Sequence, residues 1–265
     1  MRLSIGATAP LAALALAVSA ALCGCGVAGG SGESARLEWP VMGTVAAVQS
    51  RGCEPTLARD AAKPVLAEVE RLLNAHDPKS ELSSLAKLSD DELLARCSPA
   101  VRPCYEAAFM MRVESGGVFN PRWRGPGTMD LGAIAKGFAV DLAAERIKSA
   151  GAAAKDGTLL DLGGNLKAVA GDWRVGVFGG NGEMFTLREG EAAATSGEYF
   201  RGRHIRDGRT GGEVDKRAYS VTVIHPSSAM MADALSTTLF ILGREKGEAF
   251  LRARHPEARS IWLDK

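Results

Sequence analysis

The feature that most constrains the fold is a series of short apolar segments in the second half of the chain, separated by glycine pairs. The pairs are Gly163-Gly164 and Gly179-Gly180, and the segments around them are residues 158–161, 166–170, 173–178 and 184–187. Connections this short join antiparallel neighbours, because parallel strands need a crossover of about a dozen residues or more. Each glycine pair therefore predicts a β-hairpin.

Segments with helical periodicity surround these strands. The predicted helices are residues 56–74 with a kink or a late start at Pro64, a short helix from Ser80, a helix from Ser98-Pro99 to Gly116, and residues 133–149, 230–242 and 246–254. The further predicted strands are residues 37–49, 219–224 and 260–263. Together these elements predict an α+β fold, a single compact domain with largely antiparallel or mixed sheets packed with helices.

The first residues have the pattern of an export signal. Arg2 precedes an apolar run, residues 11–22, that is too short for a good membrane span. The run ends at Cys23-Gly24-Cys25, which resembles a bacterial lipobox with Cys25 as the lipidated residue. Lipidation at Cys23 and a plain cleaved signal are the alternatives.

This interpretation divides the chain into three parts. Residues 1–24 are expected to be a lipoprotein signal peptide, residues 25–34 a flexible glycine/serine tether and residues 35–265 the folded domain. The protein is then expected to be exported and anchored to a membrane by its lipid, facing the periplasm or the cell exterior.

Composition excludes one class of partner. A net charge of +1 and an aromatic content of 6% provide no basic or stacking surface for nucleic acid. Three cysteines follow the predicted signal: Cys53, Cys97 and Cys104. In an oxidising compartment two of them can form one disulfide, which leaves the third free.

The segment DLGAIAKGFAVD, residues 130–141, opens a helix directly after Gly132. A helix start offers unpaired amides and a partial positive charge, which suit a phosphate, and Lys136 adds a full charge. The alternative is an ordinary helix that carries a lysine. Asp141, more than a turn beyond Lys136, is expected to be structural. The predicted apolar stripe of this helix is Ile134, Phe138, Leu142 and Ile147.

A second polar pattern lies in the apolar helix MMADALSTTLFIL, residues 230–242. Asp233 and Thr237 are spaced i, i+4 and face the same way, and Ser236 is close to both. A buried carboxylate is costly unless it is paired or binds a cation, and oxygen ligands suit magnesium or calcium. The alternative is a carboxylate that pairs with an arginine or caps the helix.

His204 lies in a turn-rich stretch with several arginines, residues 201–212. A histidine has a pKa suited to acid–base catalysis near neutral pH. A lone histidine in such a stretch is also consistent with an ordinary surface residue.

Taken in order, these segments resemble the ApbE family of FAD:protein FMN transferases, as a shortened member. The motifs that carry the resemblance are MGT at 42–44, DPKSELSSL at 77–85, GGVFNP at 116–121, DLGAIAKGFAVD at 130–141, LLDLGGN at 159–165, ATSG at 194–197, HIRDGRTG at 204–211, SVTVIHP at 220–226 and ADALSTTLFILG at 232–243.

The resemblance implies a magnesium-dependent reaction that moves FMN from FAD to a threonine hydroxyl of an acceptor flavoprotein, with release of AMP. The implied partners are FAD and an acceptor such as a subunit of a membrane redox complex. Some relatives instead hydrolyse FAD to FMN and AMP, so an FAD pyrophosphatase is one alternative. A non-catalytic FAD-binding lipoprotein is the other.

The resemblance also implies roles for individual residues. The implied magnesium site comprises the Ala133 carbonyl, Asp233 and Thr237, with Ser236 adjacent. His204 matches a proposed base for the threonine hydroxyl, and Lys136 is implied to meet the FAD phosphates. The positions that match FAD contacts are Met42, His76, Val118, Phe119, Asn120, Asp130, Lys136 and Ile205.

The sequence departs from the family pattern in several places. A long segment that usually precedes DLGxIAKG is reduced to residues 122–129. Asn120 replaces a usual aspartate and Ala86 a usual asparagine, while Gly208 and Glu213 replace prolines. These differences predict a trimmed wall of the FAD pocket.

Overall fold

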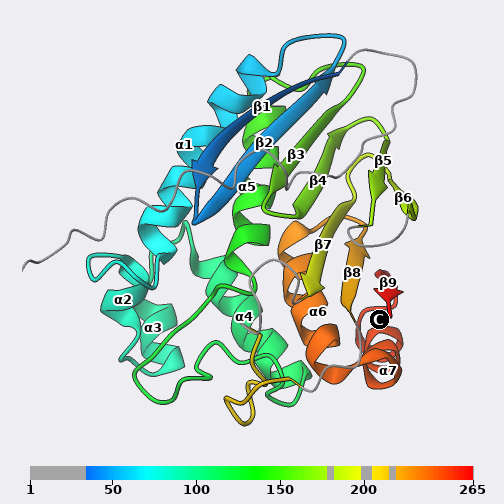
Figure 1. Cartoon of the computed structure of the whole chain (residues 1–265). Helices are drawn as coiled ribbons and strands as arrows, with labels where there is room; N and C mark the ends of the chain where they lie inside the picture. Colours follow the sequence, from blue (N-terminus) through cyan, green and yellow to red (C-terminus); the bar gives the residue numbers. More distant parts are fainter. Residues whose placement is uncertain (1–33, 178–181, 198–204, 215–218, 265) are drawn as a thin grey trace, which may run out of the picture.

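The computed structural model describes residues 34–177, 182–197, 205–214 and 219–264 (Figure 1). The predicted signal peptide, the lipidation site Cys25, nearly all of the predicted tether and His204 lie outside the described residues. Among the helices that the structure describes, none combines the length and the apolar character that a membrane crossing requires.

Seven of the described strands form one antiparallel sheet in the order β1-β2-β3-β4-β7-β8-β9. Their bounds are Ser34–Val41 for β1, Thr44–Arg51 for β2, Thr158–Leu162 for β3, Asn165–Ala170 for β4, Ala192–Gly197 for β7, Ser220–His225 for β8 and Arg259–Leu263 for β9. A separate hairpin pairs β5, Trp173–Gly176, with β6, Met184–Leu187. The α+β prediction is therefore confirmed, as is the hairpin at Gly163-Gly164.

The described helices are α1, Thr56–Leu73; α2, Glu81–Leu85; α3, Asp90–Arg96; α4, Arg102–Glu114; α5, Ala135–Ser149; α6, Ala229–Leu242; and α7, Arg244–Arg254. α5 packs on β3 and β4, α6 packs on β7 and β8, and α1 lies against α5 (Figure 1). The two long central helices, α5 and α6, also contact each other, and this contact builds the candidate site.

Side chains alternate between the two faces of the main sheet. Leu160 and Val169 belong to the large core beneath the helices. Their neighbours Leu159 and Ala168 belong to a smaller core that includes Trp173 of the β5–β6 hairpin. The sheet is thus covered by helices on one face and partly by this hairpin on the other.

The predicted strand at residues 37–49 is two strands, β1 and β2, joined at Met42-Gly43. Both turn residues have positive φ, 52° for Met42 and 65° for Gly43. Such a two-residue turn matches the twist of the flanking strands, and its positive φ angles are adopted most easily by glycine. The sequence did not predict this turn, because the apolar pattern continues across it and because methionine is rarely found in the left-handed region.

Three helical predictions also need correction. α1 starts at Thr56 and continues through Pro64, so the late start is wrong. α4 begins at Arg102, because Ser98 instead accepts hydrogen bonds from Val101 and Arg102 in a turn. α3 was not predicted, although Ser89 and Glu92 form a capping box at its start.

Two smaller expectations are also settled. Leu142 is exposed, so the predicted apolar stripe of α5 is buried only at its other members. Cys53 is an exposed free thiol, and Cys97 and Cys104 are buried free thiols. The disulfide that the sequence allowed among these three cysteines is absent.

Candidate functional site

A cavity of about 860 Å³ opens where the ends of the central strands meet the start of α5 and the middle of α6. Ten of the predicted site residues line it: His76, Val118, Phe119, Asn120, Asp130, Ala133, Lys136, Ile205, Asp233 and Thr237. Met42 and Ser236 are described but do not line this cavity. The volume is within the range of small-molecule and cofactor sites.

Asp233 is held at the contact between α5 and α6. The Asp233 side chain is 8% exposed, and Oδ2 accepts a hydrogen bond of 3.0 Å from the backbone amide of Gly137. That amide is in the first turn of α5, where backbone N–H groups are not used by the helix itself. The first turn of α5 therefore does hold a negative group, and that group is a carboxylate of the protein.

Lys136 supplies the positive charge beside this carboxylate. Its Nζ lies 3.6 Å from Asp233 Oδ2 and donates a 3.0 Å hydrogen bond to the Gly132 carbonyl. Lys136 also lines the cavity. The predicted arginine pair for Asp233 is wrong, because the paired cation is Lys136. The predicted cap is right in kind only: the carboxylate binds an amide at the start of α5 and does not cap its own helix, α6.

The oxygen groups around Asp233 suit a hard cation. Ala133, Asp233 and Thr237 line one part of the cavity, and the Thr237 hydroxyl lies 3.2 Å from Ser196 Oγ. Within the described ranges no group of three or more His, Cys, Asp or Glu side chains could hold a metal. Magnesium is commonly held by one or two carboxylates together with substrate phosphates, so the residues present fit that ion.

Ser236 is close to Asp233 in α6 but does not line the cavity. It is fully buried. Its hydroxyl donates a hydrogen bond of 2.9 Å to the Asp233 carbonyl and lies 2.9 Å from Ser196 Oγ. The contact with Ser196 attaches α6 to the end of β7. The role of Ser236 as a metal ligand stays a prediction.

The start of α6 is held by Asp141 of α5. Its carboxylate accepts hydrogen bonds from the Ser228 hydroxyl at 2.9 Å and from the amides of Ala229 and Met230 at 2.8 and 3.0 Å. Lys167 of β4 lies 3.3 Å from the same carboxylate. Asp141 thus fixes α6 one helical turn before Asp233, a contact that agrees with the structural role expected for it.

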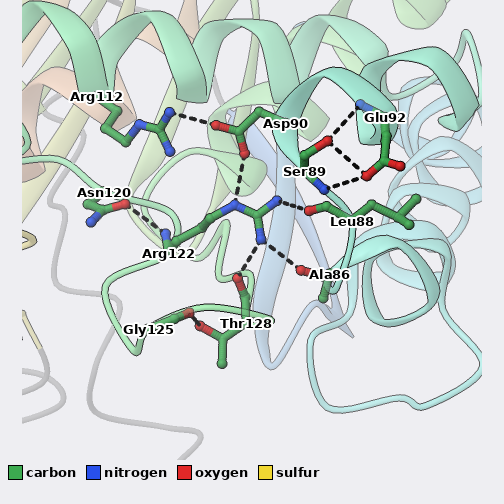
Figure 2. Close-up of polar contacts among 10 residues, drawn as sticks. All are labelled: Ala86, Leu88, Ser89, Asp90, Glu92, Arg112, Asn120, Arg122, Gly125 and Thr128. Carbon is green, nitrogen blue, oxygen red and sulfur yellow. Dashed lines mark hydrogen bonds and ion pairs between the residues drawn. The ribbon is translucent and has the colours of Figure 1, made fainter.

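Arg122 holds the shortened segment in place (Figure 2). Its guanidinium bonds Asp90 at 2.8 Å and the carbonyls of Ala86, Leu88 and Thr128 at 2.7, 2.7 and 3.2 Å. The side chain is only 15% exposed. One arginine therefore ties residues 122–129 to the segment between α2 and α3.

Two departures from the family pattern are in direct contact. Asn120 Nδ2 donates a 2.9 Å hydrogen bond to the Gly208 carbonyl. The Gly208 amide donates a 3.0 Å hydrogen bond to the Val118 carbonyl. A Cβ on Gly208 would lie 2.5 Å from the Asn120 Cβ. An aspartate at 120 could not donate this bond, and a proline at 208 has neither the N–H nor the room.

Asp130 attaches the same short segment to the helix start. Its carboxylate accepts hydrogen bonds from Gly132 N at 2.9 Å and Trp123 Nε1 at 3.2 Å, and it pairs with Arg124 at 3.3 Å. Trp123 and Arg124 both line the cavity. Sequence reasoning missed them because they lie in the segment where the family pattern is interrupted.

The opposite wall is formed by strand ends and turns, and it too was missed. Arg36, Asp161 and Gly163 line it. Asp161 bonds Arg36 at 3.1 Å and the Gly164 amide at 3.0 Å. Burial raises the pKa of this carboxyl, and the nearby Arg36 opposes the shift.

Two predicted FAD contacts lie at the margin of the cavity. His76 is exposed and follows α1. Met42 donates its backbone amide to Glu70 at 2.9 Å, while its neighbour Gly43 lines the cavity. Their contacts with FAD stay predictions.

Comparisons with known proteins agree with this geometry. A sequence model described as the ApbE family matches residues 122–262, just over half of the chain. The chain is 34% identical over 143 residues to an FAD:protein FMN transferase of Vibrio cholerae, covering 47% of this chain and 42% of the relative. It is 36% identical over 151 residues to one of Treponema pallidum, covering 47% and 40%. The chain therefore matches less than half the length of these curated relatives.

Solved structures extend the likeness to most of the chain. The flavin transferase ApbE of Vibrio cholerae superposes with a TM-score of 0.70 at 21% identity, covering 88% of this chain and 97% of that one. The apo flavinyl transferase ApbE of Pseudomonas stutzeri gives 0.71 at 20% identity, covering 88% and 92%. The overall fold is shared with these proteins.

Proposed function

Because the chain belongs to the ApbE family, we propose that it is a magnesium-dependent FAD:protein FMN transferase. In this reaction the FMN phosphoryl group leaves the FAD pyrophosphate and joins a threonine oxygen of an acceptor flavoprotein, and AMP is released. The observation that carries the proposal is the convergence of Lys136, Asp233, Thr237 and Ala133 on one cavity.

Catalysis of phosphoryl transfer depends mainly on the positioning of the reacting groups and on the neutralisation of their negative charge. Magnesium bound by Asp233, Thr237 and the Ala133 carbonyl would neutralise the pyrophosphate and polarise its oxygens. Lys136, fixed by Gly132 and Asp233, adds a cation that can orient the same group. The wall formed by residues 118–124 would hold the rest of the dinucleotide.

Removal of the threonine proton is assigned to His204. This residue lies outside the described range, so its role rests on the family resemblance. Ile205, the next residue along the chain, lines the cavity. The lipid anchor at Cys25, export, and an acceptor in a membrane redox complex are proposals that rest on the sequence and the resemblance.

Transfer is tested by incubating the protein with FAD, magnesium and a threonine-bearing acceptor domain, then measuring the acceptor mass. The expected result is a gain of one FMN less water, accompanied by AMP, and no gain when the acceptor threonine is replaced by alanine. Release of AMP and free FMN without labelled acceptor would establish a pyrophosphatase instead. FAD that stays bound and intact would establish a carrier.

The metal assignment is tested with Asp233→Ala. Loss of the buried carboxylate should abolish magnesium-dependent turnover, whereas Asp264→Ala, which removes an exposed carboxylate paired with Arg244, should leave turnover unchanged. Normal magnesium-dependent turnover in Asp233→Ala would show that the metal binds elsewhere.

A further inference from the structure

Trp123 is the tryptophan of this chain that is not buried. The chain has four tryptophans, and all of them lie in the described ranges. Trp39, Trp173 and Trp262 are 7%, 0% and 7% exposed, whereas Trp123 is half-buried and lines the cavity. An indole that stays partly exposed on a cavity of this size offers a large flat surface to a ligand.

Trp123 also differs from other aromatic residues of the cavity wall. Phe119 lines the cavity but is 3% exposed and belongs to the large core. Phe185 lines it as well but packs against the smaller core. Trp123 belongs to neither of these cores of the described residues. Packing inside the protein therefore does not account for its ring.

The indole is held in place by two charged groups of the same wall. Its Nε1 donates a 3.2 Å hydrogen bond to Asp130 Oδ2, and the guanidinium carbon of Arg124 lies over the ring, 4.6 Å from its centroid. Arg124 in turn pairs with Asp130 at 3.3 Å. Because both charged residues also line the cavity, the ring between them forms part of the wall. A ring fixed in this way loses little conformational entropy when a ligand binds.

Asp130 connects this ring to the part of the site assigned to the phosphates. Its Oδ1 accepts a 2.9 Å hydrogen bond from the Gly132 amide, and the Gly132 carbonyl accepts one of 3.0 Å from Lys136 Nζ. Consecutive hydrogen bonds thus link Trp123 to the lysine that is proposed to orient the pyrophosphate. A ring attached to that pyrophosphate through a sugar-type chain can reach this part of the wall.

We propose that Trp123, with Arg124 against its ring, stacks on a planar ring system of the dinucleotide and thereby determines the specificity of the site. This inference rests on the proposed function. FAD has a flat aromatic ring system at each end, adenine on the AMP half and isoalloxazine on the FMN half, and both offer the same stacking chemistry. The cation–π contact with Arg124 holds the indole for this role.

Calorimetry in the presence of magnesium tests this assignment, with FAD, AMP and FMN as separate ligands. Trp123→Leu removes the ring and should weaken FAD binding about tenfold or more. Trp123→Phe keeps a ring but loses the hydrogen bond to Asp130, and it should retain most of the affinity. The loss in Trp123→Leu should recur with AMP or with FMN alone, and the affected ligand identifies the ring that stacks.

Trp262→Phe is the matched control, because Trp262 is buried and does not line the cavity. It should bind all three ligands as the wild type does, and circular dichroism checks the folding of every variant. The indole N–H signals of tryptophan-labelled wild-type protein give a second measurement that does not depend on Trp123→Leu. The Trp123 signal, assigned by its absence in Trp123→Phe, should shift when the ligand binds.

Two results would overturn the inference. One is an unchanged FAD affinity in Trp123→Leu together with an unshifted Trp123 signal. The other is an equal loss of affinity in Trp123→Leu and Trp123→Phe, because the residue would then act only through its hydrogen bond to Asp130. A wild-type protein that binds none of the three ligands would instead overturn the proposed function itself.

Discussion

At the scale of single residues, Gly137 determines how closely α5 and α6 approach. A Cβ at this position would lie 2.2 Å from the Ala229 carbonyl oxygen and 2.8 Å from the Asp233 Cβ. The absent side chain is what lets the Gly137 amide reach the Asp233 carboxylate. The glycine of the AKG motif is therefore required by packing between helices.

Gly137→Ala tests this requirement, because helix propensity and packing predict opposite signs. Alanine in a helix interior is favoured over glycine by up to about 1 kcal/mol. The added methyl group would clash with the backbone of Ala229, which can move only if the packing of the two helices changes. We therefore expect a net loss of about 2 kcal/mol or more in the free energy of unfolding. Urea denaturation measures the change, and a rise in stability would contradict the packing argument.

Gly208 gives a second prediction at this scale. Gly208→Pro restores the residue usual in the family but removes the hydrogen bond to Val118 and introduces the clash with Asn120. We expect a loss of about 3 kcal/mol in thermal or urea unfolding. Gly212→Ala in the same loop, where the nearest atom is a threonine hydroxyl, should cost less than about 1 kcal/mol. Equal effects of the two variants would refute this account.

The residues of the site were predictable only in part. Lys136, Asp233 and Thr237 follow from the motifs, and the cavity does bring them together. The pairing of Asn120 with Gly208 was not predictable, because 88 residues separate them and each departure is unremarkable alone. The buried and unpaired oxygen of Asn165 was not predictable either, because the residues next to it along the chain indicate only the turn at Gly163-Gly164.

At the scale of elements, Arg122 holds the short segment 122–129 against its neighbours. Its bonds connect residues 122–129 to the α2–α3 connection and to Asp90, which also pairs with Arg112 at 2.6 Å (Figure 2). The planar fork of arginine can serve several carbonyls and a carboxylate together, which the ammonium of a lysine cannot. The short wall therefore depends on this residue for its position.

We expect Arg122→Ala to lower the free energy of unfolding by about 2–4 kcal/mol, because it leaves partly buried carbonyls and Asp90 with fewer partners. Arg124→Ala, in the same segment but half exposed, should cost less than about 1 kcal/mol. Chemical denaturation of both variants measures the difference. Similar losses would mean that the segment is held by other contacts.

The elements themselves were largely predictable where local signals agree. Gly163-Gly164 marked its hairpin correctly, and the ends of α5 and α6 lie within two residues of the predicted ones. The β1–β2 hairpin was not predicted, because Met42 occupies a turn position where glycine or asparagine is usually found. Strand order across the sheet could not be predicted, since it depends on pairings between distant segments.

At the scale of the whole molecule, acid should weaken the fold through His225. Its Nδ1 accepts hydrogen bonds from the amides of Ser227 and Ser228 at 3.2 and 2.9 Å, which requires the neutral ring. Burial lowers the pKa of His225; Glu257 and Asp141 oppose this shift, and His255 and Lys167 reinforce it. Because the pKa of His225 is lower in the folded protein, the unfolded chain binds a proton at this residue at a higher pH than the folded protein does. Stability therefore falls as pH drops below about 6.5.

His225→Asn provides the comparison, because its amide oxygen can accept in place of Nδ1 without titrating. Urea midpoints measured from pH 8 to pH 5 should fall more for the wild type than for the variant. Parallel curves would show that His225 does not contribute to the acid sensitivity.

The contact between Gly137 and Asp233 has a final consequence for how the protein folds. The two residues are 96 positions apart, and Ala46 of β2 pairs with Leu162 of β3. Pairings between such distant segments form slowly, since a long loop must close before they become favourable. The site therefore exists only once almost the whole chain has folded, and binding of FAD, the proposed substrate, would stabilise the completed protein relative to its folding intermediates.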